Sequence, residues 1–162
     1  MKKGSLLNWF KCIILFLIVV IICYIIFNFT NNEQNIEKLT DNWIEMVTIE
    51  NNPTKVAELF CSDGSLVGTV SKEIRTKENI KAYFNFFAKL PGIKVISRTY
   101  NISKISSNVY TNTAFITWNW DGLNEPIIAR MTFIFRGNCI FQLHSSALPE
   151  LNEDLLHISG TR

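Results

Sequence analysis

The sequence contains few of the residues on which enzyme active sites and metal centres usually depend. It has only two histidines, His144 and His157, and no group of His, Cys, Asp and Glu residues has the spacing of metal ligands. A glycine-rich phosphate loop, the G-x-S-x-G motif of serine hydrolases and the protein-kinase motifs are all absent. We therefore assign no catalytic residue, no metal site and no cofactor, and we lean towards a protein that is not an enzyme.

An excess of charge is also lacking. The 16 basic and 14 acidic residues give a formal net charge of +2, and the lysines are scattered along the chain. Domains that bind nucleic acid normally concentrate Lys and Arg on one face or along one helix. Nucleic acid is therefore not an expected partner.

Cysteine is too scarce and too widely spaced for a disulfide framework. Cys12 and Cys23 lie in an apolar N-terminal stretch, whereas Cys61 and Cys139 belong to the rest of the chain. The second pair would form a disulfide if the domain faced an oxidising compartment. We favour two separate buried thiols and keep the disulfide as the alternative.

One long apolar run stands near the N-terminus. Residues 12–29 carry no charge, and with the apolar residues before them they reach the roughly 20 residues that a spanning helix needs. A signal peptide has a shorter apolar core and small residues at its cleavage site. We therefore predict a transmembrane signal-anchor helix over 12–29, preceded by a cytoplasmic segment, residues 1–11, with a cleaved signal peptide as the alternative.

The charges on the two sides of this run predict its orientation. Lys2, Lys3 and Lys11 precede it, while five acidic residues lie from Glu33 to Glu50. Positively charged flanks tend to stay in the cytoplasm. We expect a single-pass protein in contact with membrane lipid, its N-terminus cytoplasmic and its C-terminal domain extracytoplasmic or lumenal.

The residues after the run have the length of one ordinary domain, 33–150, followed by a polar tail, 151–162, that we expect to be flexible. Apolar residues first recur at helical spacing, in a helix from Ile36 to Val47, a short helix after Asn52-Pro53 and a third helix capped by Thr76. The period then becomes two, in segments 94–105, 109–121, 127–136 and 139–146. This order predicts an α+β domain with a curved antiparallel sheet of about four to six strands packed on N-terminal helices.

Two arginines inside largely apolar strands are the first candidates for a ligand site. Arg98 shares its face with Ile96, Tyr100 and Ile102, so we expect it to point inward. A buried guanidinium needs a carboxylate, ordered water or an anionic ligand beside it. Arg130 lies on the more polar face of its strand, and solvent exposure is an equal alternative there.

The last hairpin predicts the neighbours of Arg130. If Gly137-Asn138 form a two-residue turn, Arg130 lies opposite Ser145, and His144 lies on the other face near Phe133. A register slip of one residue would reverse these faces. His144 is accordingly interpreted as a core or interface residue.

The same hairpin resembles a known family. Residues 129–136, Ala-Arg-Met-Thr-Phe-Ile-Phe-Arg, and 142–149, Gln-Leu-His-Ser-Ser-Ala-Leu-Pro, resemble the end of the calcium/calmodulin-dependent protein kinase II association domain. Trp43, residues 56–60 (Val-Ala-Glu-Leu-Phe) and residues 80–84 (Ile-Lys-Ala-Tyr-Phe) fit the same family. This family belongs to the nuclear-transport-factor-2-like, polyketide-cyclase-like cone superfamily, whose fold is cystatin-like.

The resemblance implies a cone that forms homo-oligomers and holds a small polar or anionic ligand. In the family, the arginine of the penultimate strand lines the pocket, and Arg130 is the matching residue. Many stand-alone relatives have two adjacent histidines before Ser-Ser, whereas this chain has Leu143 in the first place, which puts histidine-dependent chemistry in doubt. The pocket candidates are Arg130, Arg98, Ser145, Tyr100 and Trp118.

Three functions are consistent with these features. The first, which we favour because no catalytic set is recognisable, is a membrane-anchored, non-catalytic module that self-associates, binds a small ligand, or both. The second is a small pocket enzyme, resembling the cyclases and isomerases of the superfamily, with Asp63, Glu73, Asp121 or His144 as the available groups. The third is a membrane adaptor or envelope protein that docks another protein.

Overall fold

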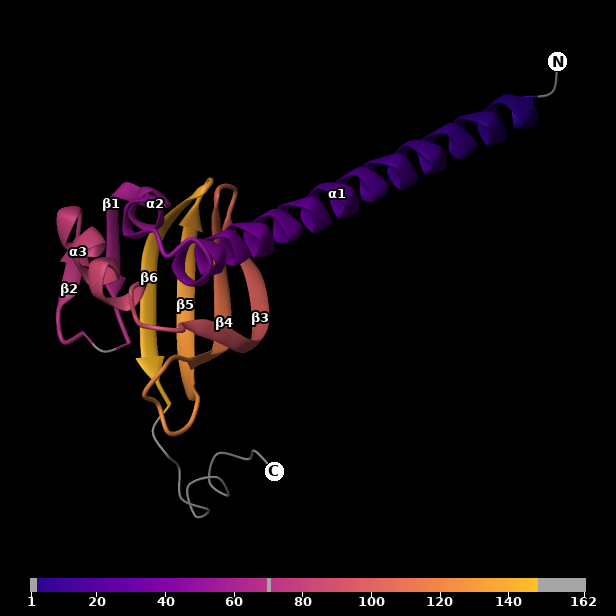
Figure 1. The fold of residues 1–162 in the computed structure, drawn as a ribbon. Helices are drawn as coiled ribbons and strands as arrows, with labels where there is room; N and C mark the ends of the chain where they lie inside the picture. The colour runs from indigo at the N-terminus through magenta and orange to yellow at the C-terminus, as the bar shows by residue number, and fades with distance from the viewer. Residues whose placement is uncertain (1–2, 70, 149–162) are drawn as a thin grey trace, which may run out of the picture. The chain divides into compact units, whose positions relative to one another are not determined.

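The structure is a computed structural model that describes residues 3–69 and 71–148, without the side chains of residues 3–8, 10 and 25–32. The elements follow one another as α1 (Lys3–Thr48), α2 (Pro53–Glu58), β1 (Phe60–Val67), β2 (Ile74–Thr76), α3 (Glu78–Phe87), β3 (Lys94–Ser106), β4 (Val109–Asn119), β5 (Ile127–Arg136) and β6 (Cys139–Ala147) (Figure 1). The chain forms two compact units, which divide after Asn35.

The first unit is helical and consists of the N-terminal part of α1. The large apolar side chains from Ile14 to Ile22 are about half exposed or more. The predicted anchor, 12–29, and the predicted cytoplasmic segment, 1–11, lie partly outside the described side chains, and the predicted tail, 151–162, lies wholly outside the described residues. Among the residues that were described, no helix combines the length and hydropathy of a membrane span.

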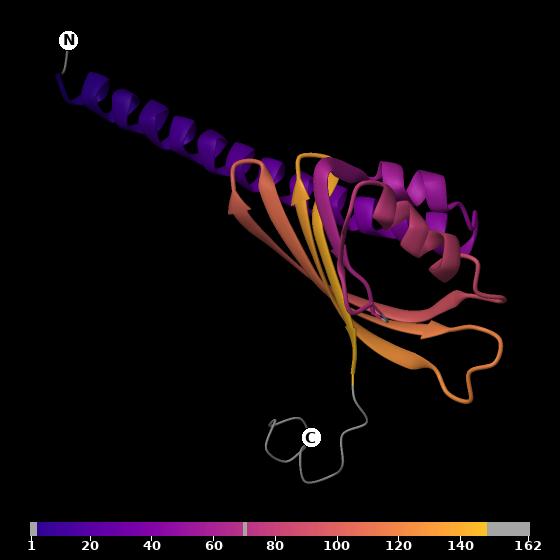
Figure 2. The same cartoon turned by 90° about the vertical axis from the view of Figure 1, so that its left-hand side faces the viewer.

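The second unit confirms the predicted α+β class. Its sheet has six strands in the order β2-β1-β6-β5-β4-β3, is curved, and carries the helices of this unit on its inner face (Figures 1 and 2). The predicted antiparallel arrangement is wrong at one place, because β1 and β6 run parallel. Hairpins join β3 to β4, β4 to β5 and β5 to β6, so these strands alternate in direction. No hairpin joins β1 to β6, and the long connection between them, which includes α3, allows the two strands to run parallel.

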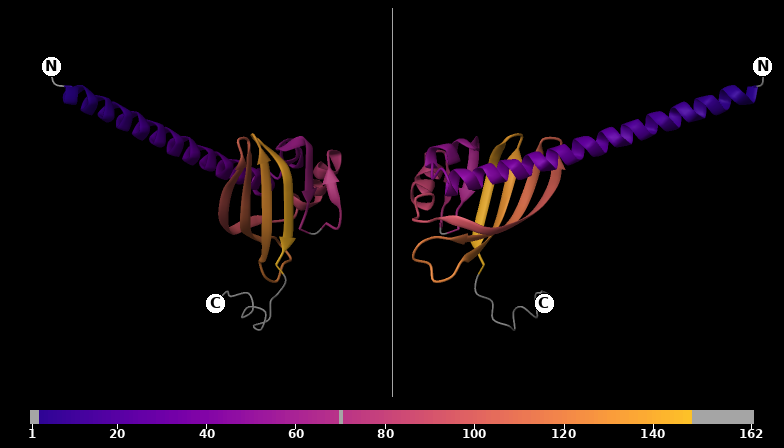
Figure 3. Two further views of the ribbon diagram at one scale, coloured as in Figure 1. Left: turned by 180° about the vertical axis from the view of Figure 1, so that it is seen from behind. Right: turned by 45° about the vertical axis from the view of Figure 1, so that its right-hand side comes forward.

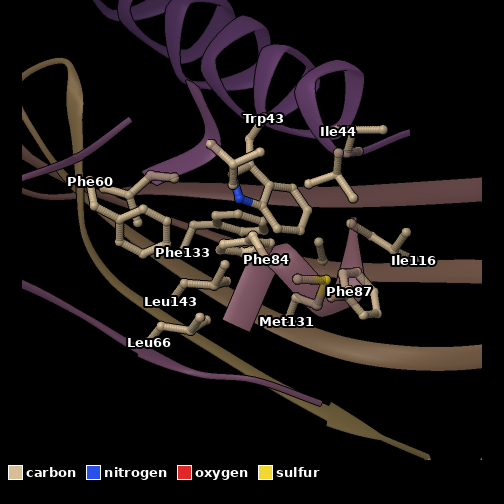
Figure 4. Close-up of a cluster of buried hydrophobic side chains, with 14 of the residues drawn as sticks. Trp43, Ile44, Phe60, Leu66, Phe84, Phe87, Ile116, Met131, Phe133 and Leu143 are labelled. Atoms are coloured by element: carbon tan, nitrogen blue, oxygen red, sulfur yellow. The ribbon is translucent and has the colours of Figure 1, made fainter. Parts of the chain in front are cut away.

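The core lies between the end of α1 and the inner face of the sheet. Trp43 is 1% exposed and meets Phe133 and Phe84 edge to face, with ring centroids 5.2 and 5.9 Å away (Figure 4). It meets Trp118 in the same way at 6.0 Å. Such contacts add about 0.5–1.5 kcal/mol each to the burial of the rings themselves. The helix is held here because Ile36, Trp43 and Val47 recur at helical spacing and are all buried.

The two short helices begin in different ways. The Asn52 side chain accepts a hydrogen bond from the Lys55 backbone N–H at 3.2 Å, as a cap before Pro53 should. The prediction that Thr76 caps α3 is wrong: Thr76 ends β2, and Lys77 precedes the helix with φ 51° and no side-chain cap.

The expectation of two separate thiols is also wrong, because Cys61 and Cys139 form a disulfide. The bond joins β1 to β6 where the register between these strands shifts, between Phe60 and Ser65. Residues 62–65 therefore lie within β1 at this irregularity. Arg136 and Asp63 form an ion pair at the same end of the sheet.

Loss of this disulfide should destabilise the second unit. It joins residues 78 positions apart, and closing a loop of that length removes about 4 kcal/mol of unfolded-state entropy. We expect the Cys61→Ser/Cys139→Ser double variant, or reduction of the wild type, to lower the free energy of unfolding by up to that amount in denaturation followed by tryptophan fluorescence. Cys12→Ser/Cys23→Ser is the matched control and should change nothing. If four thiols react in the unreduced, denatured protein, the disulfide is absent.

Candidate functional site

The inner face of the cone holds a small, partly open and mostly apolar cavity. Its walls include Trp43, Tyr83, Trp118, Met131 and Leu143, from α1, α3 and three strands. Its volume of about 10 Å³ is close to the ~10–15 Å³ that one water molecule requires. Large side chains therefore fill most of the interior that could otherwise take a ligand (Figure 4).

The polar side of this cavity is formed by two hydroxyl groups. Ser145 is 4% exposed, and its Oγ lies 2.5 Å from the Oγ1 of Thr69, at a distance where either can donate. The indole N–H groups of Trp43 and Trp118 are buried and have no hydrogen-bond acceptor among the described residues. The cavity walls thus combine hydroxyl and indole groups, which suit one water or another very small hydrogen-bonding molecule.

A register shift explains why Ser145 faces inward. Arg136 pairs with Cys139 as predicted, but the pairing slips by one residue between Ile134 and Phe135. Beyond the slip, Met131 lies opposite Ser145. The predicted pairing of Arg130 with Ser145 is therefore wrong.

The slip also moves His144 to the outer face. It lies opposite Thr132 and is exposed, so the predicted position in the core near Phe133 is wrong. Arg130 is exposed as well, between Phe115 on β4 and Ser146 on β6. Of the pocket candidates, only Ser145 and Trp118 line the interior cavity.

Arg98 and Tyr100, on β3, form a second polar cluster with Asp41 of α1. The Nε and one terminal nitrogen of Arg98 contact the two carboxylate oxygens of Asp41 at 2.9 and 3.0 Å. The Tyr100 hydroxyl donates to Asp41 at 2.6 Å. Arg98 thus lies on the predicted face and has a carboxylate partner, but it is exposed, so the expectation of a buried guanidinium is wrong. Ile96, at a register shift of β3, is 53% exposed.

This cluster links the edge strand β3 to α1. The Arg98 and Asp41 side chains are 45% and 35% exposed, so the pair is partly solvated and contributes modestly to stability. Beside it lies an open groove of about 520 Å³ between α1 and the start of β3, with Glu45, Lys94 and Ile93 among its lining residues. Sequence reasoning missed Asp41 and Thr69 as partners of the candidate residues.

No family model and no curated protein matches this chain. Among solved structures, a putative calcium/calmodulin-dependent protein kinase II association domain from Xanthomonas campestris is 29% identical, with a TM-score of 0.62 over 72% of this chain and 87% of that one.

Two further structures show the range of names attached to this fold. An NTF2-like protein of unknown function from Pseudomonas putida is 13% identical, with a TM-score of 0.65 over 76% of this chain and 97% of that one. A putative scytalone dehydratase from Novosphingobium aromaticivorans is 11% identical, with a TM-score of 0.58 over 74% and 86% of the two chains. Identities this low show the fold alone.

The environment of Tyr100 makes its ionisation a test of the Asp41 cluster. Burial, and then the hydrogen bond to Asp41, raise the pKa of Tyr100 above its ordinary value. The unfolded chain therefore loses this proton first, and stability should fall as the pH rises above about 10. We expect Tyr100→Phe to lose less unfolding free energy than the wild type over that range, while Tyr24→Phe, in the first unit, behaves as the wild type. Equal losses in all three proteins would contradict the assignment.

The segments on which the resemblance rests lie in the last hairpin and in the core. Residues 129–136 belong to β5, residues 142–147 belong to β6, and Trp43 is buried in the core. The chain thus has the cystatin-like cone of the nuclear-transport-factor-2-like superfamily, the fold it shares with the Xanthomonas campestris association domain.

Proposed function

We propose that this chain is a membrane-anchored, non-catalytic module that associates with copies of itself. The observation that carries the proposal is the likeness to the Xanthomonas campestris structure, which covers 87% of a protein described as an association domain. The cone is the part of this chain that matches, so assembly is the function that transfers most directly.

The interior of the cone supports a non-catalytic role. A cavity of about 10 Å³ accommodates about one water and no organic substrate. Neither a carboxylate nor a histidine is among its described lining residues. The two exposed candidates, Arg130 and His144, do not converge on it, so a ligand role for Arg130 would have to be exercised on the outer surface.

A position at a membrane is supported by the N-terminal sequence and by the disulfide. Residues 12–29 are uncharged, and most of the apolar side chains described within them are exposed. Structural disulfides persist in oxidising compartments and are rare in the cytosol. The bond between Cys61 and Cys139 therefore favours the orientation that the N-terminal lysines predict, with the cone outside the cytoplasm.

Fractionation of a bacterial host that expresses the full chain tests the anchor and its orientation. We expect the protein to remain in the membrane after alkaline carbonate extraction, and added protease to digest the cone in unlysed spheroplasts. A variant that lacks residues 1–29 is the matched control and should leave the membrane fraction. Recovery of the full chain in the soluble fraction would disprove the anchor, and protection of the cone until lysis would disprove the orientation.

The oligomeric state of the full chain in mild detergent tests self-association. Light scattering after size exclusion should give a protein mass of at least two chains at micromolar concentration. A single-chain mass throughout a concentration series would contradict the proposal. Crosslinking in the native membrane separates it from the adaptor hypothesis, which requires products that contain a second, different protein.

A further inference from the structure

We propose that Asn101 is the acceptor of an N-linked glycan when the chain enters a eukaryotic secretory route. The proposal rests on the orientation included in the proposed function, which places the cone outside the cytoplasm, and it adds a modification site to the cone. Asn101, Ile102 and Ser103 form the Asn-x-Ser acceptor pattern, whose middle residue is anything except proline. Such a short pattern is common by chance, and only an exposed acceptor can carry a glycan in the folded chain.

Asn101 lies near the middle of β3, which is the strand at one edge of the sheet. Its partner is Thr113 on β4, and no described strand pairs with the other side of β3. A glycan attached here has open space on the side where a further strand would otherwise stand. Because an N-linked glycan is bulky and solubilising, it belongs on the protein surface, and the edge strand offers such a place.

The Asn101 side chain points away from the helices. Paired residues of neighbouring strands share a face of the sheet, and Thr113, the partner of Asn101, is exposed on the outer face. Tyr100, the residue before Asn101, pairs with the buried Ala114 on the inner face. The helices of the second unit lie on that inner face (Figure 3). A glycan on Asn101 therefore extends into solvent without displacing the core.

Both polar side chains of the acceptor pattern are exposed on this outer face. Asn101 and Ser103 are two positions apart, and side chains two positions apart in a strand point to the same side. Neither the Asn101 amide nor the Ser103 hydroxyl forms a hydrogen bond with a described residue. The nitrogen that carries the sugar is therefore not needed to hold β3 in place.

The modification joins the side-chain nitrogen of Asn101 to a sugar. The host's oligosaccharyltransferase supplies an oligosaccharide that is carried on a lipid diphosphate. A bond forms between Nδ2 and the anomeric carbon of the first sugar, and the bond between that carbon and the diphosphate oxygen breaks. The lipid diphosphate leaves with the bonding electrons, and Nδ2 gives up one proton to a base of the transferase. The step requires no oxidant or reductant.

A second acceptor pattern, Asn28-Phe29-Thr30, provides an internal comparison. It lies at the end of the predicted anchor, 12–29, where the bilayer and its headgroups surround the chain. A soluble face of the transferase has less access there than it has to the cone. We therefore expect one glycan on each chain, at Asn101.

Synthesis of the full chain in a eukaryotic cell tests the site. We expect the membrane-bound protein to carry one oligosaccharide. Peptide N-glycosidase releases the glycan and converts its asparagine to aspartate, which peptide mass spectrometry should locate at residue 101. Asn101→Gln and Ser103→Ala should lose the glycan completely, whereas Ser103→Thr, which keeps the hydroxyl, should retain it. Asn28→Gln is the matched control and should carry the same glycan as the wild type.

Folding and orientation are measured in the same membranes. The disulfide between Cys61 and Cys139 should be intact in every variant, and added protease should leave the cone undigested until detergent opens the vesicles. A folded, protected cone without a glycan would overturn this inference and leave the proposed orientation standing. A cone that is digested in sealed vesicles would overturn both. A glycan on Asn28 in place of Asn101 would overturn the assignment to the edge strand.

Discussion

The pairing of β5 with β6 slips by one residue between Ile134 and Phe135, and the use of both faces of the sheet depends on that slip. Side chains alternate along a strand, so a shift of one position exchanges every inward residue for an outward one. The slip places Ser145 beside Met131 in the core and His144 beside Thr132 on the outer face. Without it, a titratable imidazole would lie among aromatic side chains and a hydroxyl would be in solvent.

The interior that this arrangement closes is organised around Trp43. Its ring lies against residues of α3, β4 and β5, so one side chain of α1 holds both layers together. Asp41 lies two residues before Trp43 on the same helix and binds Arg98 and Tyr100, which links the edge strand β3 to α1. Because these contacts fill the cone, the polar residues left to interact with other molecules are those on its surface.

The sequence predicted the elements whose signals are local or periodic. The apolar spacing of Ile36, Trp43 and Val47, the Asn52 cap and the alternation along β3 to β6 each depend on a few neighbouring residues. The slip in the last hairpin has no such signal, since Gly137-Asn138 is consistent with either register. The disulfide and the parallel β1–β6 pairing join residues far apart in the chain. The sequence allowed a carboxylate partner for Arg98 without identifying it as Asp41. It gave no indication that Thr69 contacts Ser145.

The described polar groups are distributed unevenly between the two faces of the sheet. His144 and Arg130 face outward, whereas the polar groups among the described lining residues of the interior cavity are hydroxyl and indole groups around a space of about 10 Å³. The outer face exposes Phe115 and Ile128 beside Arg130. Removing such apolar side chains from water is favourable, so this face carries the apolar surface that a contact with another molecule could bury.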